Sequence, residues 1–304
     1  MIRYIIHRFA WLVIILLIIS TVSFFIMRFT PGGPFDKERS LPAAIEKNIQ
    51  AKYDLDKPLF TQYFLYLRNL CKGDLGPSFK YRNRTVNEII GGSFLVSALL
   101  GGFALIIAFD IGITIGMISA VRQNSAFDYL TMFIAMIGIS MPSFFLGMLL
   151  MILFSFKIEL FPPGGWGGIG HIVLPVITLA APFTAYIARL MRTSMLDVLK
   201  QNYIQTAIAK GLPYTRVITN HAFKNAVLPV ISYMGPAAAS ILTGSVVVEK
   251  IFAIPGLGSH FVNGALNRDY TLVMGTVLLY STLLVILNII VDILYMYLDP
   301  RVKQ

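Results

Sequence analysis

The sequence predicts an all-α membrane protein with six transmembrane helices, and three observations support this prediction. Hydrophobic residues make up 56% of the 304 residues and charged residues only 13%, against roughly 25% charged in an ordinary soluble domain. The mean hydropathy is +0.73. The apolar residues gather in six runs, and a helix needs about 20 such residues to cross a hydrocarbon core about 30 Å thick. A water-soluble core could not use this much apolar surface.

Each run is expected to form a helix, because a backbone amide in hydrocarbon must be hydrogen-bonded within its own segment. The fourth run contains Pro175 and Pro182, which membrane helices tolerate when neighbouring groups satisfy the freed carbonyls. The first run could be taken for a cleavable signal peptide, but it is too long and no small-residue cleavage site follows it. The six runs are residues 9–27, 94–120, 129–156, 172–191, 227–248 and 272–297.

The basic residues predict the orientation, since Lys and Arg in short loops stay in the cytoplasm. The net charge is +10, but the cations lie between apolar runs and form no patch, so nucleic acid is not an expected partner. Both termini are predicted to be cytoplasmic in a multi-pass protein of the cell inner membrane. The short outer loops hold Lys157, Lys250 and Arg268; the inner segments hold Arg3, Arg8, Arg122, Arg189, Arg192, Lys200, Lys210, Arg216, Lys224, Arg301 and Lys303.

Two long segments lie outside the membrane in this arrangement. Residues 30–93 form a predicted outer extension, with a turn at 31–34, a helix over 42–70 and a loop at 73–77. Residues 192–226 lie on the cytoplasmic side, and their sequence predicts a helix, a break at Gly211-Leu212-Pro213 and a second helix. The chain therefore divides into residues 1–29, the cytoplasmic N-terminus and first membrane helix; residues 30–93; and residues 94–304, a core of five membrane helices.

Catalytic signatures are missing from the sequence. A phosphate-binding loop ends in Gly-Lys-Ser/Thr, and no Gly-Lys dipeptide occurs. The four histidines lie on separate segments, the single Cys71 excludes an internal disulfide, and Ser259 and His260 are adjacent and so point apart. We expect a chain that is not an enzyme and binds no cofactor or metal. Its energy source must be an ion gradient or another subunit.

Ionisable groups inside a bilayer are candidates for function, because burial there costs about 2.5–3.5 kcal/mol at mid-helix. Asp110 could line a polar path or pack against a polar neighbour, and Asp292 with Asn288 is expected to have a structural role. Methionines of the third run could form an adaptable lining or simply pack, and Pro142, like the other prolines, could act as a hinge or an ordinary kink. The candidate path residues are Asp110, Met136, Ser140, Met141, Ser143 and Met234.

The inner segment carries the most specific pattern. Residues 203–211 read Tyr-Ile-Gln-Thr-Ala-Ile-Ala-Lys-Gly, and His221 and Leu228-Pro229 follow. This resembles the EAA loop of ABC importer permeases. In that family Glu-Ala-Ala, three residues, Gly, nine residues and Ile-x-Leu-Pro form a coupling helix that docks into a groove on the ATPase subunit.

The match departs from the general motif at its second half. Gln205, Thr206 and Ala207 occupy the Glu-Ala-Ala positions and Gly211 the glycine. The departure, which resembles the dipeptide and oligopeptide branch, places His221, Phe223 and Lys224 where the general motif has Ile, Leu and Pro. Without the resemblance, 192–226 could be a linker whose cations only obey topology.

Further stretches extend the resemblance over nearly the whole chain. They are residues 28–35, 73–79, 255–258, 267–270 and 299–301. Together they resemble the B-type permease subunit of oligopeptide and dipeptide importers. The resemblance implies the type I ABC importer permease fold, with an extended extracytoplasmic segment after the first helix.

The resemblance also implies function and partners. The chain would form half of a peptide path beside a homologous second permease, with two ATP-binding subunits inside, a peptide-binding protein outside and membrane lipid around it. Nickel, antimicrobial peptides and glutathione are alternative substrates in related importers. A stand-alone ion-driven carrier and a membrane-embedded enzyme are rivals from other classes. The implied ATPase-coupling residues are Gln205, Thr206, Ala207, Ala209, Lys210, Gly211, Arg216 and His221.

Overall fold

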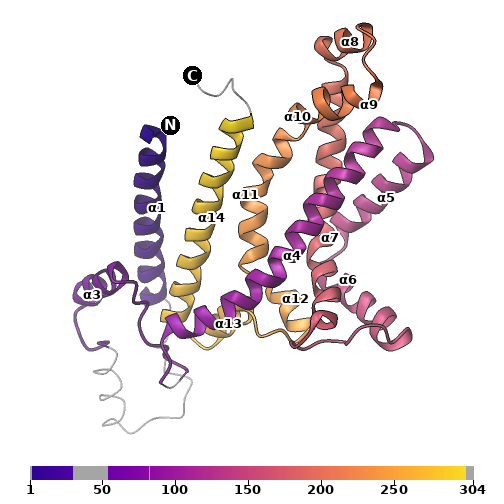
Figure 1. Ribbon diagram of the computed structural model, residues 1–304. Coiled ribbons are helices and arrows are strands. Elements are labelled where there is room, and N and C mark those ends of the chain that lie inside the picture. The colour runs from indigo at the N-terminus through magenta and orange to yellow at the C-terminus, as the bar shows by residue number, and fades with distance from the viewer. Residues whose placement is uncertain (1, 30–53, 82, 299–304) are drawn as a thin grey trace. The chain divides into compact units, whose positions relative to one another are not determined.

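The computed structural model describes residues 2–29, 54–81 and 83–298 (Figure 1). The turn predicted at 31–34, the start of the predicted 42–70 helix and the stretch 299–301 lie outside these residues. Within them the secondary structure is helical, with one isolated bridge between Pro77 and Thr85. The predicted all-α class is therefore confirmed.

The described residues contain five helices or helix pairs long and apolar enough to cross a membrane. They correspond to α1 (Ile2–Phe29), α4 (Val86–Val121), α7 (Ile169–Leu199), α11 (Leu228–Leu242) continued by α12 (Val246–Ile251), and α14 (Tyr270–Leu298). Two prolines, Pro175 and Pro182, lie inside α7.

The third predicted span is broken. Helix α5 (Ala126–Ser140) and the pair formed by α6 (Ser143–Met151) and a π-helical turn (Ile152–Lys157) meet at an angle of 108°. Met141 has an extended backbone, with φ −79° and ψ 125°, because the residue before a proline is pushed out of the helical region. The predicted number of six spans is reached if this pair, with Pro142 at its corner, counts as one bent span, and the described residues hold five if the pair is a re-entrant loop.

Contacts divide the chain into two compact units. The N-terminal unit is Met1–Val96 with Gly256–Val285, and the core unit is Ser97–Pro255 with Ile286–Gln304. Each unit thus combines segments that are distant in sequence. The division into residues 1–29, 30–93 and 94–304 stays a prediction.

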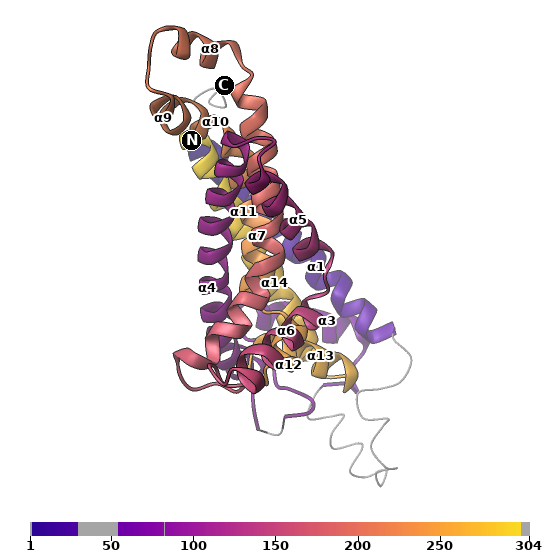
Figure 2. The same ribbon diagram turned by 90° about the vertical axis from the view of Figure 1, so that its right-hand side faces the viewer.

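In the core unit, α4 lies very close to α7 and α11. A Cβ added to Gly101 would stand 2.6 Å from the carbonyl oxygen of Ile241, and one added to Gly116 would overlap the carbonyl oxygen of Ala188. Small residues allow such close approach of membrane helices. In Figures 1 and 2, α4, α5, α7 and α11 run beside one another, with α8 (Asn202–Ala209) beyond the end of α7.

In the N-terminal unit, α3 (Leu59–Cys71) packs on α1 through aromatic rings. Phe24 of α1 lies 5.4 Å from Tyr63 and 5.6 Å from Tyr66, between ring centroids. The start of α4 packs on Leu257 of α13 (Leu257–Leu266) and on Leu272 of α14. Of the predicted helix over 42–70, residues 59–70 are confirmed as part of α3, whereas residues 54–58 form a turn and not a helix.

A buried carboxylate joins the loop after α3 to the start of α14. Asp269 is fully buried and accepts hydrogen bonds from the Ser78 hydroxyl and the backbone N–H groups of Phe79 (3.1 Å) and Leu272 (3.3 Å). The Thr271 hydroxyl donates to the Pro77 carbonyl at 2.7 Å. Two stretches that carried the sequence resemblance, 73–79 and 267–270, thus form one bonded structure.

Candidate functional site

The segment 192–226 is built as predicted, with one refinement. Helix α7 runs without interruption to Leu199, and α8 follows after two residues. Beyond the break come α9 (Tyr214–Arg216), a π-helical turn (Val217–Ala222) and α10 (Phe223–Ala226), which lead into α11. The predicted helix, break, helix pattern is confirmed, and its second half is less regular than one α-helix.

Helix α8 has two distinct faces. Ile204 is fully buried and Ala207 is 6% exposed, three residues apart and therefore on one side. The outer face combines apolar with polar groups: Tyr203 is 42% and Ile208 is 41% exposed. An isolated eight-residue helix is marginal in water, so the buried pair holds α8 in place. Of the predicted coupling residues, the structure leaves Gln205, Thr206, Ala209, Lys210, Gly211, Arg216 and His221 exposed and buries Ala207.

The end of α8 is fixed by Gly211, whose φ is +78°. The Gly211 N–H donates to the Ile208 carbonyl at 2.9 Å, and the Leu212 N–H donates to the Ala207 carbonyl at 3.4 Å. This is the Schellman arrangement, which needs a left-handed residue after the helix. A Cβ added to Gly211 would meet no atom within 4 Å. The constraint on Gly211 within the chain is therefore its backbone conformation and not space.

The two halves of the segment are bonded to each other. The Asn225 side-chain amide donates to the Tyr203 hydroxyl at 2.7 Å, across the break. Val217, Ile218, Ala222 and Ala226 turn inward and are buried. The segment is therefore held as one body at the end of α7 and α11 (Figure 2). Its exposed cations include Lys210, Arg216 and Lys224.

A buried ion pair lies at the base of this segment, and sequence reasoning missed it. The Arg192 guanidinium donates to both oxygens of Asp128, at 2.6 and 2.7 Å, and Asp128 is 1% exposed. Ser119 of α4 and the Asn124 N–H bond the same carboxylate, at 2.8 and 3.0 Å. The Ser-x-x-Asp pattern at Ser125 predicts only a helix start. Asp128 thus ties the ends of α4, α5 and α7 together.

The candidate path residues do not form one cluster. Met136, Ser140, Met141 and Ser143 lie at the bend between α5 and α6, with Met136 and Ser140 exposed. Asp110 is exposed on α4, and Met234 is half-buried on α11. Their common role stays a prediction. Asn288 of α14 lies directly beside Gly235 of α11, and the structural role expected for Asp292 with Asn288 stays a prediction.

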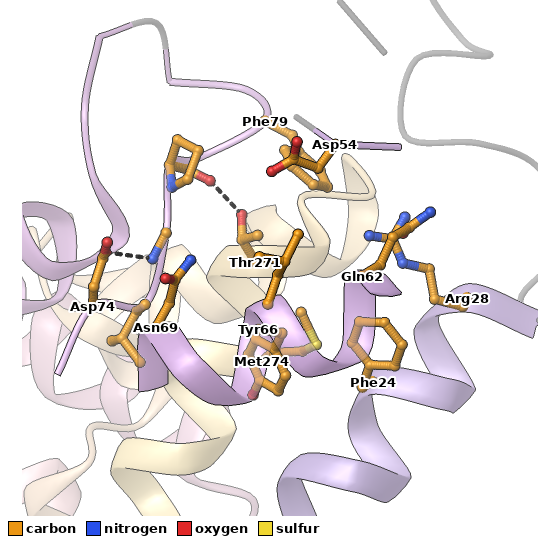
Figure 3. Close-up of a pocket in the computed structure, with 14 residues that line it drawn as sticks. Phe24, Arg28, Asp54, Gln62, Tyr66, Asn69, Asp74, Phe79, Thr271 and Met274 are labelled. Atoms are coloured by element: carbon orange, nitrogen blue, oxygen red, sulfur yellow. Dashed lines mark hydrogen bonds between the residues drawn. The ribbon is translucent and has the colours of Figure 1, made fainter. Parts of the chain in front are cut away.

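A small hollow lies in the N-terminal unit. Its volume is about 130 Å³, and Figure 3 shows it between α1, α3, the 74–79 loop and the start of α14. Arg28 lies over the Phe24 ring at 5.4 Å, and burial raises the pKa of Tyr66 to about 12. The Tyr66 hydroxyl and the Gln62 Oε1 atom have no hydrogen-bond partner in the described structure. The hollow is lined by aromatic, aliphatic and polar groups.

The described residues also hold no group of three or more His, Cys, Asp or Glu side chains able to bind a metal ion.

The helical architecture and the segment 192–226 agree with a known protein family. A family model described as "Binding-protein-dependent transport system inner membrane component" matches residues 112–304. The model of the N-terminal part of such membrane components matches residues 1–107. The chain belongs to this family. It is a multi-pass inner-membrane permease component and is not itself catalytic.

Relatives of this permease match it from end to end. The oligopeptide transport system permease protein OppB of Haemophilus influenzae is 48% identical over 305 residues, with all of both chains covered. OppB of Salmonella typhimurium is likewise 48% identical over the full lengths. The dipeptide transport system permease protein DppB of Bacillus subtilis is 46% identical, over all of this chain and 98% of its own.

A solved structure supports the permease fold. A chain of the MetNI methionine ABC transporter, in an inward-facing form, aligns with a TM-score of 0.54 and 13% identity. The alignment covers 69% of this chain and 96% of that one. At this identity the likeness concerns the fold alone, and it confirms the predicted type of helical bundle.

Proposed function

We propose that this permease forms half of the path of an ATP-driven peptide importer. The identity of 46 to 48% to oligopeptide and dipeptide permeases, over complete chains, supports peptides as the substrate. These relatives favour peptides over nickel or glutathione. The other half of the path belongs to a homologous second permease, and a peptide-binding protein delivers the substrate from outside.

The segment 192–226 is the proposed point where two ATP-binding subunits act on the permease pair. The observation that carries this is α8: a short helix closed by a Schellman turn, anchored by Ile204 and presenting Tyr203 and Ile208 outward. Exposed apolar groups rimmed by polar ones are typical of a protein contact. The cations around them suit an acidic partner surface.

Force would reach the membrane through α7. This helix has 31 residues and is therefore about 46 Å long at 1.5 Å per residue, so one end can move with α8 while the other lies across the membrane. Asp128 would carry the same movement to α4 and α5 through Arg192. The path would then open alternately to the two sides, while ATP hydrolysis stays on the partner subunits.

The basic residues support an orientation with both termini and the segment 192–226 in the cytoplasm. The segment 192–226 carries three exposed cations, Lys210, Arg216 and Lys224, as expected of a cytoplasmic loop. An ATPase in the cytoplasm could then reach it.

Reconstitution tests this function. The purified permease pair in liposomes, with ATPase subunits and a peptide-loaded binding protein, should accumulate labelled peptide only when ATP is present. An ion-driven carrier would instead transport peptide without the ATPase subunits, in response to an imposed gradient. Peptide uptake in their absence contradicts the proposal.

A further inference from the structure

Helix α11 carries an exposed face unlike that of its neighbours. Its exposed residues are Pro229, Ser232, Pro236 and Ser240. They recur every three or four positions and so form one stripe. No large apolar side chain of this helix is exposed. A membrane helix facing lipid would show large apolar groups there.

Helix α4 of the same unit provides that contrast. Its exposed residues include Leu99 (46%), Phe103 (51%) and Ile106 (67%). These three side chains suit hydrocarbon, whereas the exposed Asp110 and Thr114, which continue the same face, do not. The face of α11 therefore has a different neighbour from the 99–106 part of the α4 face.

The other sides of α11 are occupied. Ile241 packs against Gly101 of α4, and Gly235 packs against Asn288 of α14. On the side of α7, the rings of Tyr233 and Tyr186 lie 4.5 Å apart between centroids. Among the described residues, the stripe of Pro229, Ser232, Pro236 and Ser240 is left exposed, and Ser232 is next to Tyr233 of this pair.

The stripe continues onto α7. Beyond Tyr186, which is 43% exposed, the exposed residues of α7 are Arg189, Thr193 and Asp197, spaced as one helix face. Arg189 has no ion-pair partner among the residues that the structure describes. We call Ser240, Pro236, Tyr233 and Ser232 of α11, with Tyr186 and Arg189 of α7, the polar strip.

The strip offers groups that suit a peptide main chain. Pro236 has no N–H, so the Ser232 carbonyl cannot receive the usual helical hydrogen bond from position i+4 and can accept one from a passing amide. The serine and tyrosine hydroxyls both donate and accept, and the Arg189 guanidinium suits a terminal carboxylate. From Ser232 to Ser240 the helix rises about 12 Å, which is the length of roughly three to four extended residues.

We propose that the polar strip is the surface along which an extended peptide passes through this permease, held mainly by its backbone and its C-terminal carboxylate. This inference rests on the proposed peptide-import function. Backbone recognition explains how one path could accept different side chains. The other conceivable occupant, the second permease, is an outcome of the test.

The test uses single cysteines in a Cys71→Ser background of the assembled transporter, reconstituted in liposomes. A charged, water-soluble thiol reagent should modify Ser232→Cys and Ser240→Cys, but not Ile106→Cys on the apolar face of α4. With ATP hydrolysis blocked in the peptide-loaded complex, occupancy of the strip should slow modification of both strip cysteines roughly tenfold. The proposal is overturned if the strip cysteines do not react. It is also overturned if they cross-link to the second permease and their modification rate does not change when peptide is bound.

A second measurement isolates the carboxylate contact. Uptake of a peptide is compared with uptake of its C-terminal amide, using the same binding protein throughout. Arg189→Ala should reduce the preference for the free acid roughly tenfold relative to the wild type, since a charged hydrogen bond is lost, and Arg189→Lys should restore part of it. An unchanged preference contradicts the role of Arg189. If the Cys71→Ser transporter itself takes up no peptide with ATP, the proposed function has failed; if it does and the strip cysteines stay silent, only the strip has failed.

Discussion

Arg192 on α7 holds both carboxylate oxygens of Asp128 on α5, at 2.6 and 2.7 Å. The two residues are 64 positions apart in sequence, and the carboxylate is 1% exposed. Ser119 and Asn124 complete its hydrogen bonds. Breaking this pair leaves an uncompensated buried charge, so it provides a direct test of how α7 is joined to α4 and α5.

Replacing Arg192 with Ala should therefore destabilise the permease by about 3–5 kcal/mol, the usual cost of leaving one partner of a buried ion pair. Thermal unfolding of the purified protein measures this. Arg122→Ala is the matched control, because Arg122 is exposed and its guanidinium lies over the Phe127 ring, 5.7 Å from the centroid, a contact worth about 0.5–1 kcal/mol. A double variant, Asp128→Ala with Arg192→Ala, should be less damaging than the sum of the single changes. Equal effects at Arg192 and Arg122 would contradict the pairing.

Substitutions of Gly211 should separate the effect of backbone strain on stability from the effect of side-chain size on ATPase binding. Any L-residue at φ +78° costs about 1–2 kcal/mol, and Asn less. Because a Cβ at Gly211 has no neighbour within 4 Å, Ala and Trp should lower the thermal stability of the isolated permease to a similar degree. Co-purification with the ATPase subunits should nevertheless be lost with Gly211→Trp and largely kept with Gly211→Ala. If both variants bind the ATPase alike, position 211 does not lie in the docking surface.

The hydrogen bonds that Asp269 accepts should stabilise the loop after α3. Asp269→Ala removes acceptors for Ser78, Phe79 and Leu272 and should cost about 1–3 kcal/mol for the donors left unsatisfied. Asp269→Asn should also destabilise, since both oxygens of Asp269 accept and an amide has one acceptor oxygen. Limited proteolysis of the 72–85 loop reports the effect. Arg68→Ala, at an exposed position of α3 outside this loop, is the control, and equal cleavage rates in the Asp269 and Arg68 variants would contradict the stabilising role of Asp269.

Because of His260, the stability of the folded permease should depend on pH. Burial and the nearby positive charge of Arg84 lower the pKa of His260, its ring contacts Tyr81, and its Nδ1 atom is buried with no partner in the described part of the chain. The unfolded chain, with an ordinary His pKa of about 6.5, then binds the proton before the folded chain does as the pH falls. The stability contributed by neutral His260 is complete above about pH 6.5 and decreases below it. Unfolding temperatures at pH 7.5 and 5.5 should differ more for the wild type than for His260→Gln; identical differences would refute this assignment.

The sequence alone predicts the parts of this fold that depend on local pattern. Apolar runs locate the membrane helices, and Gly211-Leu212-Pro213 predicts the end of α8, as observed. The proline at 142 predicts a break, but its angle of 108° depends on packing that a local pattern does not contain. The division into two units likewise depends on contacts between distant segments.

Long-range pairs escape such reasoning for a physical reason. Asp269 meets Ser78 across 191 positions, and nothing in either local sequence specifies the partner. The polar strip was missed because exposure on α11 depends on which sides α4, α7 and α14 cover. Residues chosen by chemistry alone, such as Asp110 and Met136, lie on other helices.

The central claim is that α8 is the contact through which a cytoplasmic ATPase moves this permease. Ile208→Cys, at a 41% exposed position of α8, should cross-link to the ATPase subunit in a Cys71→Ser background, with a yield that changes between the ATP-bound and nucleotide-free states. Lys157→Cys, in a predicted outer loop, is the control that should react only from outside. Modification of Ile208→Cys by an impermeant reagent added outside sealed cells, without any cross-link to the ATPase, would contradict the account.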